Sequence, residues 1–389
     1  MDIVAQKIRQ AAALLDELDI DMWLVFVRET MMMADPALPL VVGENAVWQS
    51  FFVYTRSGRS AALVGNFDRA LFERHGRFDE VITYTQDARP ALRQLLENFN
   101  PRHLAVNYSP DNPAADGLTH GMYLLLNTYL ADTPYHARLI SAQEVCSKLR
   151  SRKLPAEIDF ISKAAQMACD AWAAASQLVA PGMTEIQIAA LVDRAIADLG
   201  AANSFPTIVN AGSKSDPGHG QPTESVLEPG DLLHIDFGVR YNNYCSDLQR
   251  LIYFPKPGEK SAPPELVRAF NLVRDIITAT AEFCRPGMPG WQVDALARKM
   301  LADNGYPEYN HALGHQLGRD VHDGGAIIGP RWERYGVTPT IPLEAGNVFT
   351  LELEIMLPGI GCVGLEEDAI LTETGARFLC PRQLALAIR

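Results

Sequence analysis

The chain has 389 residues, with 34 Lys and Arg against 47 Asp and Glu, which gives a formal net charge of −13. This length indicates two domains, and the acidic balance argues against a nucleic-acid backbone as a partner. No apolar run approaches the roughly 18 residues of a membrane span, and the six cysteines contain no CxxC pair. We therefore expect a soluble, cytoplasmic, globular protein with no nucleic-acid or membrane partner.

Residues 1–147 alternate short apolar runs with helical patches. The runs WLVFV, AALVG and HLAV are typical of strands, and residues 91–96 are typical of a helix. This alternation predicts a compact α/β domain. The basic stretch 148–153, followed by Pro155, marks the predicted boundary with a second domain over 148–389, although a solvated helix end would have the same composition.

The second half contains an internal repeat. Pro181-Gly-Met183 and Pro286-Gly-Met288 each open a helical pattern, and the two patterns end at Gly200 and Gly305, again 105 residues apart. Glycine in this position is typical of a helix C-cap. A strand hairpin follows each copy after a loop. The repeat predicts an α+β domain of two related halves, each with helices covering a hairpin of one sheet.

The first hairpin carries one acid on each arm. Asp236 and Asp247 are symmetric about Tyr241 and Asn242. A two-residue loop there would set the two carboxylates opposite each other, with Cβ atoms about 4.5–5.5 Å apart. A turn at Asn242 and Asn243 would instead shift the register and remove this pairing.

The second hairpin has the same arrangement, because Glu352 and Glu366 are symmetric about Gly359. A three-residue loop would set these carboxylates opposite each other. Like charges that face each other destabilise a sheet, and an unpaired buried charge is costly. Both pairs have apolar neighbours in the sequence. Two such pairs on related hairpins therefore predict a bound cation.

Three of the nine histidines, His311, His315 and His322, fall within twelve residues of a glycine-containing segment between the hairpins. Carboxylates with one imidazole suit Mn²⁺, Fe²⁺ or Co²⁺, and Zn²⁺ is an alternative. Four carboxylates around one divalent ion would exceed its charge. Two ions about 3.5–4 Å apart, bridged by carboxylates, balance the charge and form a two-metal hydrolytic site.

Four segments together resemble the pita-bread metallopeptidases, which include prolidase, Xaa-Pro aminopeptidase, methionine aminopeptidase and the non-metallo relative creatinase. They are PTIVNAGSKSDPGHG, HIDFG…CSDLQR, GHQLGRDVH and FTLE…GLEED. The resemblance extends from about Lys148 to Leu379. It implies a duplicated pita-bread catalytic domain over 148–389, in which helices cover a curved antiparallel sheet. A smaller creatinase-type α/β domain over 1–147 precedes it, and relatives with this domain form homodimers.

The resemblance also implies a role for each acid. Asp236 would hold the second metal ion, Asp247 and Glu366 would bridge the two ions, and His315 and Glu352 would complete the first. We expect two divalent ions per chain, with Mn²⁺ ahead of Co²⁺, Fe²⁺ and Zn²⁺. Glu352 would in addition shuttle the proton of the attacking water.

Further residues are candidates for contact with the substrate. His219 and His322 correspond to histidines that orient the scissile carbonyl and stabilise the oxyanion, and His311 corresponds to one that borders the substrate pocket. The alternative for each is a core or surface histidine. Arg331 and Arg334 are candidates for binding a substrate carboxylate, with solvated surface arginines as the alternative.

The chain departs from the family pattern in two places. Leu353 and Glu354 stand where the family usually has Pro-Gly, and Gly364 stands where the peptidases often carry an arginine. Glu354 shares the strand face of Glu352, so we expect an additional acid near the site. The missing arginine leaves the preference for proline open.

The leading hypothesis is a dinuclear metallopeptidase that hydrolyses the N-terminal peptide bond of a dipeptide or short peptide, most plausibly an Xaa-Pro bond. One alternative is an enzyme acting on a non-peptide small molecule, as a creatinase-like amidinohydrolase or a lyase. Another is a binding member of the fold without catalysis. The five filled ligand positions argue against both alternatives. The sequence does not decide between a dipeptidase and an aminopeptidase.

Overall fold

The computed structural model describes residues 2–214 and 220–389. The chain divides into two compact units, Met1–Arg150 and Ser151–Arg389. The boundary predicted between residues 147 and 148 lies inside helix α6 (Gln143–Ser151). Within the described ranges, no helix is both long enough and apolar enough to cross a membrane.

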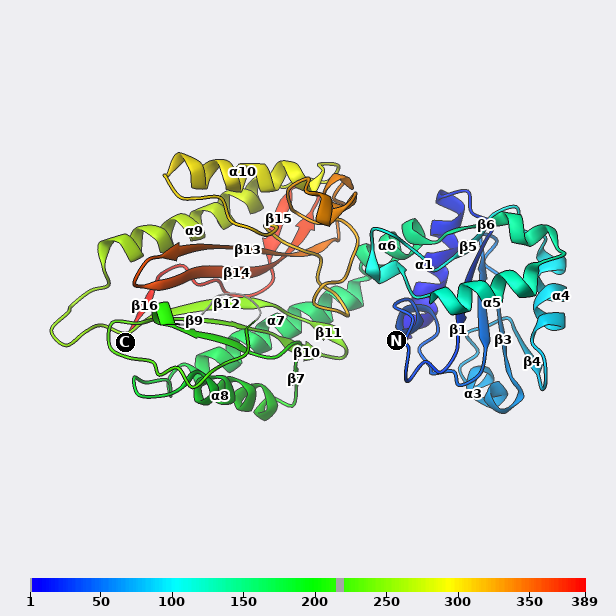
Figure 1. Cartoon of the computed structure of the whole chain (residues 1–389), viewed down its shortest axis with the longest axis horizontal. Coiled ribbons are helices and arrows are strands. Elements are labelled where there is room, and N and C mark those ends of the chain that lie inside the picture. Colours follow the sequence, from blue (N-terminus) through cyan, green and yellow to red (C-terminus); the bar gives the residue numbers. More distant parts are fainter. Residues whose placement is uncertain (1, 215–219) are drawn as a thin grey trace. The chain divides into compact units, whose positions relative to one another are not determined.

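The N-terminal unit is a mixed six-stranded sheet with the order β4-β3-β2-β1-β5-β6 (Figure 1). Strands β1, β2 and β3 are antiparallel, and β4, β5 and β6 each pair in parallel with their neighbours. The strands are β1 (Met22–Val27), β2 (Ser50–Thr55), β3 (Ser60–Gly65), β4 (Glu80–Tyr84), β5 (Leu104–Val106) and β6 (Leu139–Ser141). The helices besides α6 are α1 (Ile3–Glu17), α2 (Leu38–Val41), α3 (Arg69–Arg74), α4 (Arg89–Phe99) and α5 (His120–Leu130).

Both faces of this sheet are buried. Along β1, Trp23 and Val25 belong to a core shared with α1 and α6, whereas Leu24 and Phe26 belong to a second core shared with α4 and α5. Successive side chains of a strand point to opposite faces. A strand between two cores therefore reads as an unbroken apolar run, which explains WLVFV.

The C-terminal unit contains a seven-stranded sheet with the path β13-β14-β12-β9-β8, and a three-stranded sheet with the order β11-β10-β7 (Figure 1). The larger sheet comprises β8 (Ile208–Ala211), β9 (Leu232–Phe237), β12 (Leu248–Tyr253), β13 (Val348–Leu357), β14 (Gly361–Thr372), β15 (Gly375–Phe378) and β16 (Ala387–Ile388). The smaller comprises β7 (Ala202–Asn203), β10 (Val239–Tyr241) and β11 (Tyr244–Cys245). The helices are α7 (Pro155–Ala175), α8 (Glu185–Asp198), α9 (Pro264–Phe283) and α10 (Gly290–Asp303).

The predicted two-half arrangement of this unit is confirmed. Helices α8 and α10 begin and end 105 residues apart, which is the offset of the sequence repeat. Helices α7 and α8 share an apolar core with β9 and β12, and α9 and α10 share another with β13 and β14 (Figure 1). Each helix pair therefore covers one hairpin of the same sheet.

The two hairpins differ in register. Glu352 pairs directly with Glu366 around a three-residue loop, as predicted. The predicted pairing of Asp236 with Asp247 is wrong, because Tyr241 pairs with Tyr244 and the turn consists of Asn242 and Asn243.

Both turn residues have positive φ, at 48° and 65°, a conformation that asparagine tolerates better than most residues. The register set by this turn places Gln249 opposite Asp236.

The N-terminal unit contains a buried carboxyl group on a polar network. Asp35 is 1% exposed and accepts hydrogen bonds from Asn107 Nδ2 at 2.9 Å and from the Ala37 amide at 2.8 Å. The Asn107 side-chain oxygen in turn accepts a hydrogen bond from Trp23 Nε1 at 2.6 Å. Burial raises the pKa of Asp35 to about 6, although the bonds from Asn107 and Ala37 oppose this rise.

The raised pKa predicts that Asp35→Asn changes how stability depends on pH. Folded protein keeps the Asp35 proton up to about pH 6, whereas the unfolded chain loses it near its ordinary pKa of 3.8. The contribution of Asp35 to stability therefore falls as pH rises from about 4 to 6, by on the order of 3 kcal/mol, and is constant above that range. Thermal unfolding of both proteins from pH 4 to 7 should show the variant gaining on wild type across this window. A Tm difference independent of pH would contradict the assignment.

Candidate metal centre and active site

Four strands of the large sheet bring one row of polar side chains together. In neighbouring strands β9, β12, β14 and β13, Asp236 pairs with Gln249, Gln249 with Glu366, and Glu366 with Glu352. Residues at paired positions project from the same face of a sheet. Three predicted ligands therefore share one row, with a neutral amide between the first acid and the other two.

Asp247 reaches this row from the segment between β11 and β12. In the register of the hairpin its position faces Gly238, where a Cβ atom would lie 2.0 Å from the Ser246 carbonyl oxygen. Only glycine fits such a close approach. The Asp247 amide donates a hydrogen bond to Asp368 Oδ2 at 3.2 Å, which fixes the backbone that carries the carboxylate.

His315 lies on an extended segment that runs alongside β13. The Thr350 amide donates to the His315 carbonyl at 3.0 Å, and the Glu352 amide donates to the Leu313 carbonyl at 2.7 Å. A Cβ atom on Gly314 would lie 1.9 Å from the Thr350 carbonyl oxygen, so glycine permits this close pairing. These bonds hold the imidazole beside the carboxylates.

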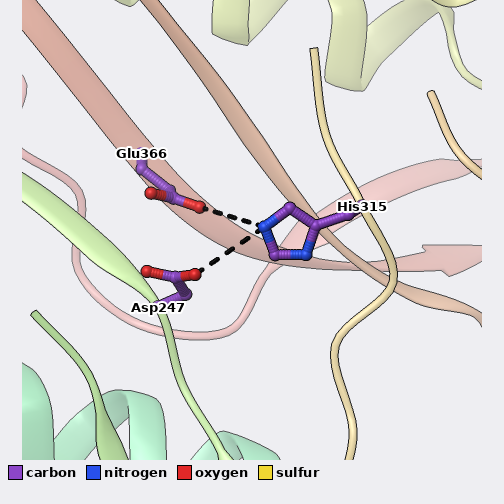
Figure 2. A group of neighbouring side chains, drawn as sticks. All are labelled: Asp247, His315 and Glu366. Atoms are coloured by element: carbon purple, nitrogen blue, oxygen red, sulfur yellow. Dashed lines mark ion pairs between the residues drawn. The ribbon is translucent and has the colours of Figure 1, made fainter. Parts of the chain in front are cut away.

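The carboxylates converge on the His315 imidazole without forming hydrogen bonds to it. His315 Nε2 lies 3.7 Å from Asp247 Oδ2, 3.6 Å from Glu352 Oε1 and 3.9 Å from Glu366 Oε1, which are longer than hydrogen bonds. One ligand atom each from Asp247, His315 and Glu366 lie within 4.8 Å of one another. Figure 2 shows these three side chains pointing toward one another.

The electrostatics of the group fit a divalent metal ion. Burial and the neighbouring acids raise the pKa of Asp247, Glu352 and Glu366 well above their ordinary values, and burial raises the pKa of Asp236 to about 7. Burial, with His322 beside it, lowers the pKa of His315 to about 3, so the imidazole is neutral and available as a ligand.

Three buried oxygens of the set also lack a hydrogen-bond partner among the described residues: Asp236 Oδ1, Asp247 Oδ1 and Glu366 Oε1. Such oxygens are costly unless a cation binds them. The donor set of carboxylates and one imidazole is one that divalent metals accept.

Gln249 joins the acids to a buried histidine. Its Nε2 donates to Glu366 Oε2 at 2.9 Å and to Glu352 Oε2 at 3.5 Å. Its Oε1 lies 2.9 Å from His234 Nε2, and His234 Nδ1 lies 3.0 Å from Asn210 Nδ2. Since Oε1 and Nδ1 are then both acceptors, this network assigns the imidazole proton to Nε2. The chain of bonds orients the Glu366 carboxylate.

The structure explains why Gly364 stands two residues before Glu366. A Cβ atom there would lie 2.6 Å from Gln249 Oε1 and 2.8 Å from His234 Nε2, so the space of a side chain is filled by the Gln249–His234 pair. Glu354 pairs with Gly364 across the strands and accepts a hydrogen bond from Cys362 Sγ at 3.7 Å. Its charge contributes to the raised pKa of Asp236 and Glu352, so the expected additional acid lies near the site.

The predicted substrate-contacting residues differ in whether they line the pocket. The rings of His322 and His315 are 4.3 Å apart, and His322 lines the same pocket as the five predicted ligands. His311 packs its ring 5.1 Å from that of Tyr309 and is not among the described residues that line this pocket. His219 lies outside the described residues.

Arg331 and Arg334 are exposed and do not belong to the described lining of the pocket. The Arg331 guanidinium stacks on Trp291 at 4.4 Å, and the Arg334 guanidinium stacks on Trp332 at 4.8 Å.

A buried ion pair fixes the loop that carries His322. Lys153 Nζ lies 2.7 Å from Asp323 Oδ2, and their side chains are only 1% and 4% exposed. Asp323 also accepts a hydrogen bond from the Asp320 amide, and a Cβ atom on Gly318 would lie 2.1 Å from its carboxylate. The loop is therefore packed tightly around one carboxylate.

Comparison with known proteins identifies the family of this chain. The sequence profile of metallopeptidase family M24 matches residues 159–373. The chain belongs to metallopeptidase family M24. An uncharacterized peptidase of Bacillus subtilis, YqhT, is 30% identical over 353 residues, which cover 90% of this chain and 89% of that protein. An Xaa-Pro dipeptidase of Pyrococcus furiosus is 33% identical over 238 residues, which cover 61% of this chain and 65% of that protein.

Solved structures of similar fold include an Xaa-Pro dipeptidase and a prolidase. An Xaa-Pro dipeptidase from Bacillus anthracis superposes with a TM-score of 0.79 at 24% identity, covering 99% of this chain and 100% of that one. The prolidase from Pyrococcus horikoshii superposes with a TM-score of 0.73 at 25% identity, covering 97% and 99%. The predicted fold, a helix-covered antiparallel sheet preceded by an α/β domain, is confirmed.

Two residues of the network around the predicted ligands, His234 and Gln249, were not predicted from the sequence. His234 and Gln249 lie two residues from Asp236 and Asp247 respectively, and the period of a strand places such neighbours on one face. This spacing was the available signal. It could not be used for Gln249 because the register of the first hairpin was predicted wrongly.

The Gln249 network predicts that two substitutions outside the ligand set weaken metal binding. Gln249→Leu removes the amide that orients Glu366, and Gly364→Ala displaces it through the Cβ contact. Loss of such a supporting hydrogen bond typically costs 10–100-fold in metal affinity. Competition with a chelator, or calorimetric titration of Mn²⁺ into metal-free protein, measures the effect.

Gly121→Ala is the matched control for the glycine substitution, because no atom lies within 4 Å of a Cβ at that position. Unchanged Mn²⁺ affinity in both Gln249→Leu and Gly364→Ala, with the control also unchanged, would show that Gln249 does not support the ligands.

Proposed function

We propose that this chain is a metal-dependent peptidase that hydrolyses the N-terminal peptide bond of dipeptides or short peptides, with Xaa-Pro as the preferred bond. The observation that carries the proposal is that Asp236, Asp247, His315, Glu352 and Glu366 line one pocket. The similarity to the Xaa-Pro dipeptidase of Pyrococcus furiosus supports the choice of bond.

Apolar side chains form another part of the pocket lining. Phe205, Pro206, Ile208 and Val321 contribute to it, which suits a proline ring or another compact apolar group.

We propose that the five ligands hold two divalent metal ions, with Mn²⁺ first, then Co²⁺, Fe²⁺ or Zn²⁺. Four carboxylates carry more negative charge than one divalent ion balances, which supports two. Asp247 and Glu366 would bridge the ions, Asp236 would hold one of them, and His315 and Glu352 would hold the other. When bound, such ions lower the pKa of a water molecule and polarise a carbonyl oxygen.

The chain's own side chains would complete the reaction around the scissile bond. Glu352 would accept a proton from the attacking water on a carboxylate oxygen and deliver it to the leaving amine. His322, in ring contact with His315, would donate a hydrogen bond to the carbonyl oxygen as negative charge develops on it. His219 is proposed for a related role, and His311 for the border of the substrate site.

Two elements of the proposal concern assembly and location. Resemblance to pita-bread peptidases with this N-terminal domain supports a homodimer, and the composition of the chain supports a cytoplasmic protein with a small peptide substrate rather than a nucleic acid.

Metal removal tests the reaction. Treatment with EDTA should abolish hydrolysis of Ala-Pro, and Mn²⁺ or Co²⁺ should restore it, because the ligands would supply no activated water on their own. The assay measures released proline, with Ala-Ala as a second substrate to test the preference for the Xaa-Pro bond. Full activity in chelated protein shown by elemental analysis to contain no metal would contradict the mechanism.

Substitution of a bridging carboxylate tests the assignment of the ligands. Asp247→Asn and Asp247→Ala should each lower kcat/KM by roughly 10³-fold or more, as loss of one member of a coupled catalytic group does. Elemental analysis should show less bound metal in both variants. Asp303→Asn, at an exposed position paired with Lys299, is the control and should keep wild-type activity and metal content. Wild-type activity in Asp247→Ala would overturn the assignment.

A further inference from the structure

The active-site pocket contains one feature that the proposed mechanism does not use. Its volume is about 420 Å³, and one part of its lining is the set of carboxylates with His315 and His322. Among the described lining residues, Arg240 is the one lysine or arginine. A volume of this size is at the small end of the usual range for ligand sites and suits a dipeptide.

Arg240 is held in place by main-chain oxygens and not by an acid. It lies on β10, and Nη1 donates to the Arg319 carbonyl at 2.7 Å while Nη2 lies 3.5 Å from the Ser204 carbonyl oxygen. Neither of these two contacts is with a carboxylate oxygen. A guanidinium has five N–H donors, so these two contacts leave donors for a further partner.

The pocket around Arg240 is acidic, yet the two contacts of its guanidinium are with main-chain oxygens. The chain carries a net charge of −13, and Arg250, by contrast, forms an ion pair with Glu367 at 3.0 Å. The proposed metal ions would be balanced by Asp236, Asp247, Glu352 and Glu366, so a substrate carboxylate needs a further cation in the pocket. Arg240 is positioned to supply that cation.

We propose that Arg240 binds the C-terminal carboxylate of the substrate, and that the chain therefore acts on peptides short enough to place this carboxylate inside the pocket, dipeptides above all. The inference rests on the proposed peptidase function and names its substrate class. The guanidinium fork matches a carboxylate with two parallel hydrogen bonds, which an amide terminus cannot replace. Arg331 and Arg334, the candidates from the sequence, stack on aromatic rings outside the described pocket lining.

Comparison of Ala-Pro with its amide, Ala-Pro-NH2, tests this proposal in Mn²⁺-loaded protein. Wild type should prefer the free acid through a lower KM. Arg240→Met should raise KM for Ala-Pro by roughly 10- to 100-fold, leave kcat within about 3-fold, and leave the amide unaffected, because a contact made equally in the ground and transition states changes KM alone. Arg240→Lys should fall between the two, since it keeps the charge and loses the fork.

Two sets of variants separate carboxylate binding from other roles of Arg240. Arg319→Met removes the same charge from the neighbouring loop, where the side chain faces Tyr244 at 5.5 Å, and should keep the acid preference. An equal loss on acid and amide in Arg240→Met would mean that Arg240 supports the loop of His322, and would overturn the proposal. Loss of the acid preference in Arg331→Met or Arg334→Met, with Arg240→Met unchanged, would also overturn it.

A binding measurement separates this inference from the proposed function. Calorimetric titration of Ala-Pro into metal-free protein reports carboxylate binding without hydrolysis, and Arg240→Met should weaken it by a similar 10- to 100-fold. Equal affinity in the variant would overturn the role of Arg240 even if the loaded enzyme is an active dipeptidase. If the loaded protein hydrolyses neither substrate, the proposed function fails, and weaker binding by the variant would still support the carboxylate site.

Discussion

Carboxylates that face one another across neighbouring strands cost the folded chain free energy unless a cation shares their charge. Glu352 and Glu366 face each other directly, and Asp236 and Asp247 add two more acids to the same pocket. The tightly packed parts of this unit serve that arrangement: Gly314 and Gly238 admit close backbone contacts, and Asp368 fixes the backbone of Asp247. The candidate metal centre is thus the main constraint on this part of the sheet.

A network of hydrogen bonds from neutral side chains restricts the positions of these carboxylates. Gln249 lies between Asp236 and Glu366 in the row and donates to Glu366, while its oxygen is turned toward His234. An amide between carboxylates orients their oxygens without adding charge. A side chain at position 364 would occupy the same space, so Gly364 and Gln249 depend on each other. Gly364, which departs from the family pattern, therefore fits the packing of Gln249 and His234 around it.

The structure was predicted correctly from the sequence where a pattern was compatible with only one arrangement of the chain. The symmetry of Glu352 and Glu366 about a glycine turn gave the correct register, and the 105-residue offset gave the correct helices. It failed at the first hairpin because two turns were compatible with the residues, and Asn242 and Asn243 form the left-handed turn. Contacts between distant segments, such as His315 against β13 or Lys153 with Asp323, have no period in the sequence and could not be predicted.

The duplicated halves contribute unequally to the pocket, and this inequality gives the site its direction. The second hairpin supplies two directly paired glutamates, whereas the first supplies Asp236 beside Gln249 and, beyond the same strand, Arg240. If both hairpins carried the same side chains, the two halves of the pocket would have the same charge. Because the first hairpin also carries a guanidinium, the pocket has an acidic region that would hold the metal ions and a basic point that favours a carboxylate. A dipeptide whose carboxylate binds Arg240 would place its peptide bond toward the metal ions, so only one orientation suits the pocket.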